Sequence, residues 1–468
     1  MTLLDENRLF PPEPSLRGLA RELYANVKNL PIVSPHGHTD PRWYAENKAF
    51  PDPAQLFVTP DHYIFRMLHS QGIPLDALGV PRVDGGEVEQ DPRKIWGLFA
   101  QNYHLFRGTP SRLWVDQAFR DVFDVRQRLS KDTADAIYDQ IADRLTQDAY
   151  RPRALFERFN IDVISTTESA LDDLRWHKII FDSGWAGRVV TTYRPDAVID
   201  PEVDNFSNNV EAFGSMAGED ASTWSGYLAA HRNRRMYFQQ FGATASDHGH
   251  RTARTENLPQ DVAAALFDKA LQGKCTAQEA DTFRGHMLTE MARMSLDDGM
   301  VLQIHPGSFR NHSIDIRTFF GNDKGFDIPT PTNYVKALQP LLNAVGNRTD
   351  LTIIVFTLDE TTYARELAPL AGVYPALKLG PAWWFNDSYE GMMRFRQMTT
   401  ETAGFYNTVG FNDDTRAFCS IPARHDVARR VDSSYLATLV ATGRLDEDEA
   451  RELGHDLAYR LAKSAYKF

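Results

Sequence analysis

Cysteine is scarce in this sequence, and long apolar runs and basic tracts are missing from it. The chain of 468 residues has only two cysteines, Cys275 and Cys419, and no Cys-x-x-Cys pair. This excludes a disulfide framework and a zinc ribbon. No run approaches about 18 apolar residues, so we expect no membrane span. The net charge of −12 and the lack of a basic tract argue against a nucleic-acid partner.

The rest of the composition is that of an ordinary globular protein, with 42% hydrophobic and 24% charged residues. The first 17 residues are polar and contain proline, without the apolar core of a signal peptide, so we expect a cytoplasmic protein. The length suits a barrel of roughly 250 residues that carries large insertions. A homo-oligomer is compatible with this sequence, which does not set the number of copies.

Eight short, apolar and β-branched runs predict strands, and most of them are separated by stretches with helical spacing. Buried strands that alternate with helices are typical of a parallel sheet covered on both faces. Eight such units predict an α/β protein with a distorted (β/α)8 TIM barrel. An open doubly wound sheet is disfavoured, because no glycine-rich phosphate loop follows the first run. The predicted strands are 30–34, 162–166, 188–193, 243–246, 300–304, 351–357, 376–379 and 408–411.

The uneven spacing of these runs predicts large helical insertions. Residues 1–38 are expected to form an N-terminal segment with the first barrel strand, and residues 39–160 a helical insertion. Residues 161–468 are expected to form the remainder of the barrel, with a second helical insertion at about 250–299. We interpret both as additions to one barrel and not as separate domains.

Two histidines follow the first predicted strand, in the string Pro35-His36-Gly37-His38. Side chains at i and i+2 of a strand point the same way, so both imidazoles can approach one ion. Divalent ions such as zinc accept neutral imidazole readily. The alternative is a pair of capping or surface histidines. Because active sites of this fold lie at the carboxyl ends of the strands, we expect a metal site here.

A site with two histidines needs an anionic ligand, and Asp414 follows the last predicted strand. Closing a barrel places its first and last strands side by side, which would bring Asp414 to the histidines. A carboxylate near both metal and substrate can also act as a general base. Asp413 is the alternative ligand, although it also suits the N-cap of a helix. Arg416, two residues after Asp414, could face the same mouth.

A second string of similar type, Asp247-His248-Gly249-His250, follows the fourth predicted strand. We interpret it as polar loop residues and not as the primary metal site. Whether Asp247 and His248 enter the site stays open at this point.

Arginines also gather after the predicted strands, at Arg194, Arg310 and Arg424. A planar guanidinium binds a carboxylate through two hydrogen bonds, so several of them around a metal predict an anionic substrate. Each alone could instead form a structural ion pair. His62 and Tyr63 begin a predicted helix of the insertion and could be delivered to the same mouth.

Together these segments resemble the uronate isomerases (glucuronate isomerases) of the amidohydrolase superfamily. The likeness keeps the family's order and spans nearly the whole chain. WWFND and the final Asp-x-Arg block are not general features of barrels. Gly37 stands where the family often has cysteine, a position expected to point away from the metal. The matching segments are HGH at 36–38, DHYIFRMLHSQG at 61–72, TTES at 166–169, TYRPD at 192–196, ASDHG at 245–249, QIHPGSFRN at 303–311, WWFND at 383–387, and NDDTRAF with RHDVARR at 412–430.

The resemblance implies reversible isomerisation of hexuronates through a cis-enediol: D-glucuronate with D-fructuronate, and D-galacturonate with D-tagaturonate. It implies one divalent metal ion, zinc in the first place and manganese or another ion as alternatives, held by His36, His38 and Asp414. Asp414 also matches the residue that moves the proton between carbons 2 and 1. Tyr63 and Arg416 match groups that shuttle protons between the oxygens on these carbons.

Other residues are expected to contact the substrate, and two other functions stay open as alternatives. The first alternative is a metal-dependent hydrolase of the same superfamily, although the fourth strand offers no lysine to bridge two metals. The second is a non-catalytic metal-binding barrel, against which the complete ligand set argues. The expected substrate contacts are His62, Arg194, His305, Arg310 and Trp383.

Overall fold

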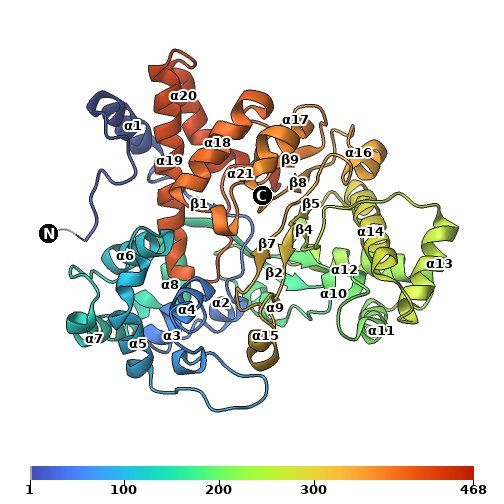
Figure 1. Cartoon of the computed structure of the whole chain (residues 1–468), viewed down its shortest axis with the longest axis horizontal. Coiled ribbons are helices and arrows are strands. Elements are labelled where there is room, and N and C mark those ends of the chain that lie inside the picture. Colours follow the sequence, from blue (N-terminus) through green and yellow to red (C-terminus); the bar gives the residue numbers. More distant parts are fainter. Residues whose placement is uncertain (1–2) are drawn as a thin grey trace.

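The computed structural model describes residues 3–468, so the first two residues of the predicted segment 1–38 lie outside it. A curled sheet of seven parallel strands lies inside a layer of helices (Figure 1). The strand order is β1-β2-β3-β4-β5-β8-β9. The strands of this sheet are β1 (Ile32–Ser34), β2 (Ile161–Ser169), β3 (Val189–Arg194), β4 (Ala245–His248), β5 (Val301–Ile304), β8 (Ile353–Val355) and β9 (Leu377–Leu379).

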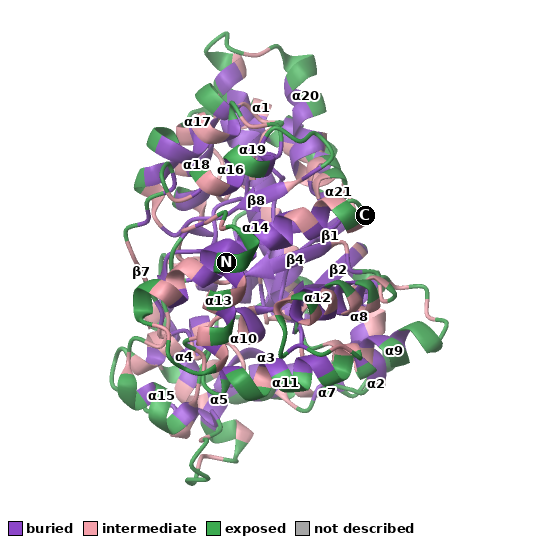
Figure 2. Cartoon of the chain, turned by 90° about the vertical axis from the view of Figure 1, so that its right-hand side faces the viewer, coloured by how far each residue is buried: buried purple, intermediate pink, exposed green. Residues whose placement is uncertain are grey.

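The centre of the sheet is formed by short apolar strands that are buried on both faces. Every residue of β5 and β8 is buried, as parallel strands covered by helices require. The register pairs Leu302 of β5 with Ile353 of β8, and Ser246 of β4 with Leu302. Figure 2 shows the strands buried at the centre, while the helices expose their outer faces. This core holds the carboxyl ends of the strands in fixed positions.

The prediction of a regular eighth strand at 408–411 is wrong. Thr408 forms only an isolated parallel bridge with Leu379 of β9. Beyond it the chain runs without regular structure to Thr415, whose carbonyl accepts a hydrogen bond from the His38 N–H at 3.1 Å. Two backbone hydrogen bonds with Leu379 connect this segment to β9, and one from His38 connects it to the segment after β1.

The long stretch between β1 and β2 is helical. Three of its helices begin with Asp-Pro, where the side chain of Asp40, Asp52 or Asp91 caps the helix and proline takes its first turn. Figure 1 shows these helices together on one side of the sheet. They are α2 (Pro41–Glu46), α3 (Pro53–Phe57), α4 (His62–His69), α5 (Pro92–Gln101), α6 (Pro110–Asp121), α7 (Ala134–Leu145) and α8 (Pro152–Arg158).

The remaining helices precede, follow or connect the other strands. Two of them, α13 and α14, lie in the chain between β4 and β5. The set comprises α1 (Pro14–Val27), α9 (Arg175–Asp182), α10 (Asp196–Ile199), α11 (Phe206–Ala217), α12 (Trp224–Gln239), α13 (Gln260–Leu271), α14 (Ala277–Asp298), α15 (Ile314–Phe320), α16 (Gln339–Val345), α17 (Ala368–Ala371), α18 (Tyr389–Ala403), α19 (Ile421–Ala441), α20 (Glu447–His455) and α21 (Leu461–Ala465).

A small antiparallel pair was not predicted from the sequence. It joins β6 (Ser308–Phe309) to β7 (Ile328–Pro329), with α15 and an irregular loop between them. Each strand has only two residues, which is too short for periodicity to reveal. The pair matters because the loop before β7 contributes side chains to the candidate site. Among residues 3–468, no helix is long and apolar enough to cross a membrane, and both cysteines are free thiols.

We expect Leu302→Ala to lower the free energy of unfolding by about 2–5 kcal/mol, because it opens a cavity in a packed core. Leu302 has no exposed surface and lies on β5, between β4 and β8. Urea unfolding followed by tryptophan fluorescence measures the change. Val83→Ala is the control, since Val83 is 67% exposed and should lose little. Equal unfolding midpoints for the two variants would contradict this account of the core.

Candidate metal-binding active site

A cavity of about 580 Å³ lies where the strands of the sheet end, a volume suited to a small molecule. Ten residues that the sequence singled out as ligands, catalytic groups or substrate contacts line it, whereas Asp413 and Arg424 do not. The ten come from α4, from the end of β3 and from the segments that follow β1, β5, β6, β9 and Thr408. The set is His36, His38, His62, Tyr63, Arg194, His305, Arg310, Trp383, Asp414 and Arg416.

The imidazoles of His36 and His38 meet the carboxylate of Asp414 in this cavity. Asp414 Oδ1 lies 3.1 Å from His38 Nε2 and 3.7 Å from His36 Nε2. One ligand atom from each residue lies within 4.8 Å of the others. Two imidazoles and one carboxylate match the donor set of divalent metal sites that keep a position open for water or substrate. The three residues could therefore hold one metal ion.

The carboxylate of Asp414 is held by its own backbone and by a tryptophan. Trp383 Nε1 donates a hydrogen bond to Asp414 Oδ2 at 2.5 Å, which leaves Oδ1 directed at the histidines. Asp414 has φ of +40°, in the left-handed region that aspartate adopts at some cost. A strained backbone that persists is typical of functional sites. Both features fix the direction of this carboxylate.

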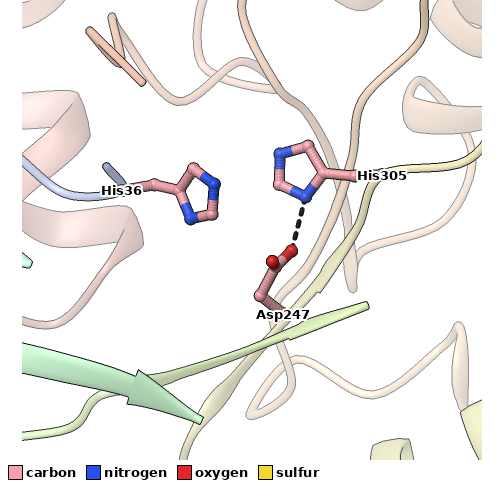
Figure 3. Close-up of side chains that lie close together, drawn as sticks. All are labelled: His36, Asp247 and His305. Atoms are coloured by element: carbon pink, nitrogen blue, oxygen red, sulfur yellow. Dashed lines mark hydrogen bonds and ion pairs between the residues drawn. The ribbon is translucent and has the colours of Figure 1, made fainter. Parts of the chain in front are cut away.

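A second carboxylate, Asp247, reaches the same cavity from β4. His305 Nδ1 and Asp247 Oδ1 share a hydrogen bond of 2.6 Å, and His36 faces them from the opposite side (Figure 3). The rings of His36 and His305 stack with centroids 4.7 Å apart. His36, Asp247 and His305 also offer ligand atoms within 4.8 Å of one another. Asp247 therefore supports the metal-binding face through His305 or binds the ion itself.

The charge states of these side chains suit metal binding. Burial lowers the pKa of His38 and of His305 below its ordinary value, which favours neutral imidazole. Burial also opposes ionisation of Asp414 and Asp247, but neighbouring side chains outweigh it and lower both pKa values. For Asp247 these neighbours are His305, which shares a hydrogen bond with it, and Arg194. Neutral imidazoles and ionised carboxylates are the forms that ligate metals.

Tyr63 belongs to a hydrogen-bonded network that the sequence did not reveal. Its hydroxyl donates to Asp387 Oδ2 at 3.1 Å, and Arg424 donates to the same oxygen at 2.7 Å. Arg424 in turn lies 3.6 Å above the ring of Trp114. Burial, followed by the charge of Asp387, raises the pKa of Tyr63 well above 10, so its phenol is neutral. Burial raises the pKa of Asp387 to about 6.

The arginines of the cavity are held by acidic or backbone partners. Arg194 pairs with Asp196 at 2.8 Å and with Asp247 at 3.2 Å. Arg310 pairs with Asp327 at 3.3 Å. Arg416 donates to the backbone carbonyl of Asp323 at 3.0 Å. These contacts hold several guanidinium groups around the cavity, as recognition of an anion requires.

The cavity departs from the sequence-based expectations at several residues. Asp413 points away and pairs with His425 at 3.1 Å, so it is neither the ligand nor a helix N-cap. Arg424 stands behind Tyr63 and does not line the cavity. The prediction that 247–250 is a loop is wrong for Asp247 and His248, which end β4.

The sequence left the role of Asp247 open and gave no role to Asp323 or Asp387, three carboxylates that line or support the cavity. Asp247 lines the cavity, which answers the question left open above, whereas His248 does not. Asp387 ends the WWFND segment, so the signal was present although no role was assigned to it. Asp323 lies in the loop before β7, and nothing in its neighbourhood pointed to the site.

Comparisons with known proteins agree along the whole chain. A family model described as glucuronate isomerase matches residues 15–466. A uronate isomerase of Rhizobium meliloti (strain 1021) is 67% identical over 465 residues, 99% of each chain. One of Mesorhizobium japonicum is 65% identical over 467 residues, 100% of each chain. A crystal structure of glucuronate isomerase from Caulobacter crescentus has a TM-score of 0.98 at 57% identity, covering 100% of this chain and 98% of that one.

We expect Trp383→Phe to weaken divalent-metal affinity by about 10- to 100-fold, because partners that orient a ligand contribute that much. The variant keeps an aromatic ring but removes the N–H that holds Asp414. Titration of the metal-free protein with Zn²⁺ in the presence of a competing chelator measures the affinity. Trp384→Phe is the matched control, since Trp384 Nε1 has no hydrogen-bond partner among residues 3–468. Equal losses in both variants would contradict the role of the Trp383 N–H.

Proposed function

Because this chain belongs to the glucuronate isomerase family, we propose that its cavity binds a hexuronate beside one divalent ion and interconverts the aldose and ketose forms. The observation that carries the proposal is the 67% identity to a uronate isomerase over 99% of each chain. The predicted isomerisation of uronates is thereby confirmed. Neither the hydrolase nor the non-catalytic barrel is supported by the relatives described above.

His36, His38 and Asp414 are the proposed metal ligands, with Asp247 and His305 beside them. Their imidazoles and carboxylates fit a divalent ion, and the unpartnered Nε2 of buried His305 points to a further ligand or solvent molecule there. Zinc suits this mixture of nitrogen and oxygen donors, and manganese is the alternative. A bound divalent ion would polarise the oxygens on carbons 1 and 2 and make the proton on carbon 2 more acidic.

Asp414 is proposed to carry the proton between carbons 2 and 1. Its carboxylate is ionised and held in direction, as a base that removes a weakly acidic proton must be. Removal of the carbon 2 proton, with protonation of the carbonyl oxygen on carbon 1, yields the cis-enediol. Loss of the proton from the oxygen on carbon 2, with return of the carried proton to carbon 1, completes the ketose.

Tyr63 and Arg416 are proposed to move protons between the two oxygens. The phenol of Tyr63 is neutral, so it can donate a proton to the oxygen on carbon 1. Arg416 supplies fixed positive charge where an oxyanion develops. Both side chains line the same cavity as Asp414.

The substrate carboxylate is expected among the arginines. Arg194 and Arg310 line the cavity and are oriented by ion pairs, which favours binding of a planar carboxylate. His62, His305 and Trp383 would contact the hydroxyl groups or the sugar face. His62 is suited to this because burial, with the nearby charge of Arg416, keeps its pKa well below 6.5.

The fold is proposed to be a distorted (β/α)8 barrel in which residues 408–415 take the place of the eighth strand. The bridge from Leu379 to Thr408 and the hydrogen bond from His38 to Thr415 support this closure. Residues 39–160 and about 250–299 are then helical insertions on the barrel, since α2–α8 and α13–α14 fall within them. Closure explains how Asp414 comes to lie beside His38.

Incubation with D-glucuronate or D-galacturonate in heavy water is the decisive test. We expect ketose formation, because the proposed base moves the proton from carbon 2 to carbon 1. Asp414→Asn should lower kcat by at least about 100-fold, the scale of lost general-base catalysis. Chromatography detects the ketose, and NMR detects deuterium at carbon 1 of the ketose and at carbon 2 of the recovered aldose. Absence of ketose from both sugars would overturn the proposed reaction.

Asp387→Asn should lower kcat, because Asp387 fixes the hydroxyl of Tyr63 without touching the substrate. Combining it with Tyr63→Phe should cost little more than Tyr63→Phe alone, since both changes remove one coupled interaction. The pKa of Asp387 near 6 adds a second readout. In the wild type, kcat/KM should fall below about pH 6 as this carboxylate takes up a proton, and the variant should lose that inflection. Additive losses with an unchanged pH profile would contradict the positioning role.

A further inference from the structure

The side chains of the string Asp247-His248-Gly249-His250 lie in two different parts of the structure. Successive residues of a strand point to opposite faces, so Asp247 enters the cavity while His248 turns away from it. His248 meets His250 and the carboxylate of Asp196, which begins α10. The three residues offer ligand atoms within 4.8 Å of one another. They form a second cluster of metal-binding side chains, separate from His36, His38 and Asp414.

Both imidazoles of this cluster are buried with a nitrogen left unpaired. His248 has no exposed surface and His250 is 5% exposed. Within the part of the chain that the structure describes, His248 Nδ1 and His250 Nε2 have no hydrogen-bond partner. Burying a polar nitrogen without a partner is costly, and the centroids of these two rings lie 5.8 Å apart. A shared ligand would satisfy both.

The shared ligand would have to suit two imidazoles and a carboxylate. An imidazole nitrogen that carries no proton offers a lone pair, as metal ligation requires. Asp196 pairs with the guanidinium of Arg194, as an ionised carboxylate does. A cation is thus the ligand that these three groups share.

Asp196 is partly engaged already. Its Oδ2 pairs with Arg194 at 2.8 Å, and both its oxygens lie 3.1–3.2 Å from the Gly249 N–H. These contacts fix the carboxylate and leave Oδ1 without a cationic partner. Asp196 also lines the wall of the cavity, so solvent can complete the coordination.

We propose that Asp196, His248 and His250 bind a second divalent ion of the zinc class, distinct from the one at His36, His38 and Asp414. Two imidazoles, one carboxylate and a solvent molecule make four ligands, the number that zinc prefers. Arg194 joins the two sites, since it pairs with Asp196 on one side and with Asp247 on the other. The second ion has a structural role: it fixes the wall of the cavity from which Arg194 projects.

Metal stoichiometry of the full chain tests this proposal without depending on activity. Wild-type protein is stripped with a chelator, loaded with Co²⁺ or Zn²⁺, passed over a desalting column and measured by elemental analysis. We expect two equivalents per chain. The double variant His36→Gln/His38→Gln removes ligands from both groups around His36, so it should keep one equivalent. One equivalent in the wild type and none in the double variant would overturn the second site.

The variant His250→Gln tests whether the second equivalent of metal binds at Asp196, His248 and His250. We expect one equivalent in His250→Gln alone and none when it is added to the double variant, with loss of the Co²⁺ absorption bands of that site. His104→Gln is the matched control, because His104 is exposed and belongs to neither cluster. Two equivalents in His250→Gln would overturn the assignment.

If this variant does not fold, the stoichiometries of the wild type and the double variant still test the second site. Failure of the primary site would give a different result: the wild type would bind one equivalent of metal, and His36→Gln/His38→Gln would still bind it.

Discussion

The hydrogen bond from the His38 N–H to the Thr415 carbonyl joins the segment after β1 to the segment after Thr408, and the candidate site depends on it. It places Asp414, the residue before Thr415, beside the imidazole of His38 at 3.1 Å. These residues are more than 370 positions apart in the sequence, so local structure cannot bring them together. The irregular backbone of 409–415 follows from this task. A regular strand would alternate its side chains, whereas the left-handed conformation of Asp414 turns its carboxylate toward the histidines.

Strand alternation gives β4 a dual role. Asp247 faces the cavity and orders His305, while His248, the next residue, lies with His250 and Asp196 and does not line the cavity. Arg194, at the end of β3, spans both sides through Asp247 and Asp196. The position of this guanidinium is therefore set by two carboxylates from different strand ends. A change at either carboxylate would leave Arg194 with one partner and alter the wall that faces the substrate.

The sequence predicted the parallel sheet and its seven strands from apolar β-branched runs, and several cavity residues from polar side chains where those runs end. The catalytic roles of Tyr63 and Arg416 came from the family resemblance. The sequence could not predict that residues 408–411 pair through a single bridge. Their residue types are those of a strand, and only the tertiary structure determines whether they form a regular one. The partners of the cavity residues were equally hidden. Asp387 lies 324 positions from the tyrosine that it orients, and no spacing rule links them. Asp323 belongs to a loop between two strands of two residues each, where periodicity carries no signal.

The cavity lining carries both signs of charge, with five arginines among eight acidic residues. The chain carries −12, yet its mouth presents Arg194, Arg310 and Arg416 around a metal-binding group. Acidic or carbonyl oxygens already hold each of these guanidinium groups, so they are ordered before an anion arrives and little entropy is lost on binding. The same pairing limits how much positive charge the cavity exposes. Under the proposed function, the carboxylate of a uronate would meet donors whose directions are fixed by Asp196, Asp327 and the Asp323 carbonyl. An anion would then be selected by geometry as well as by attraction.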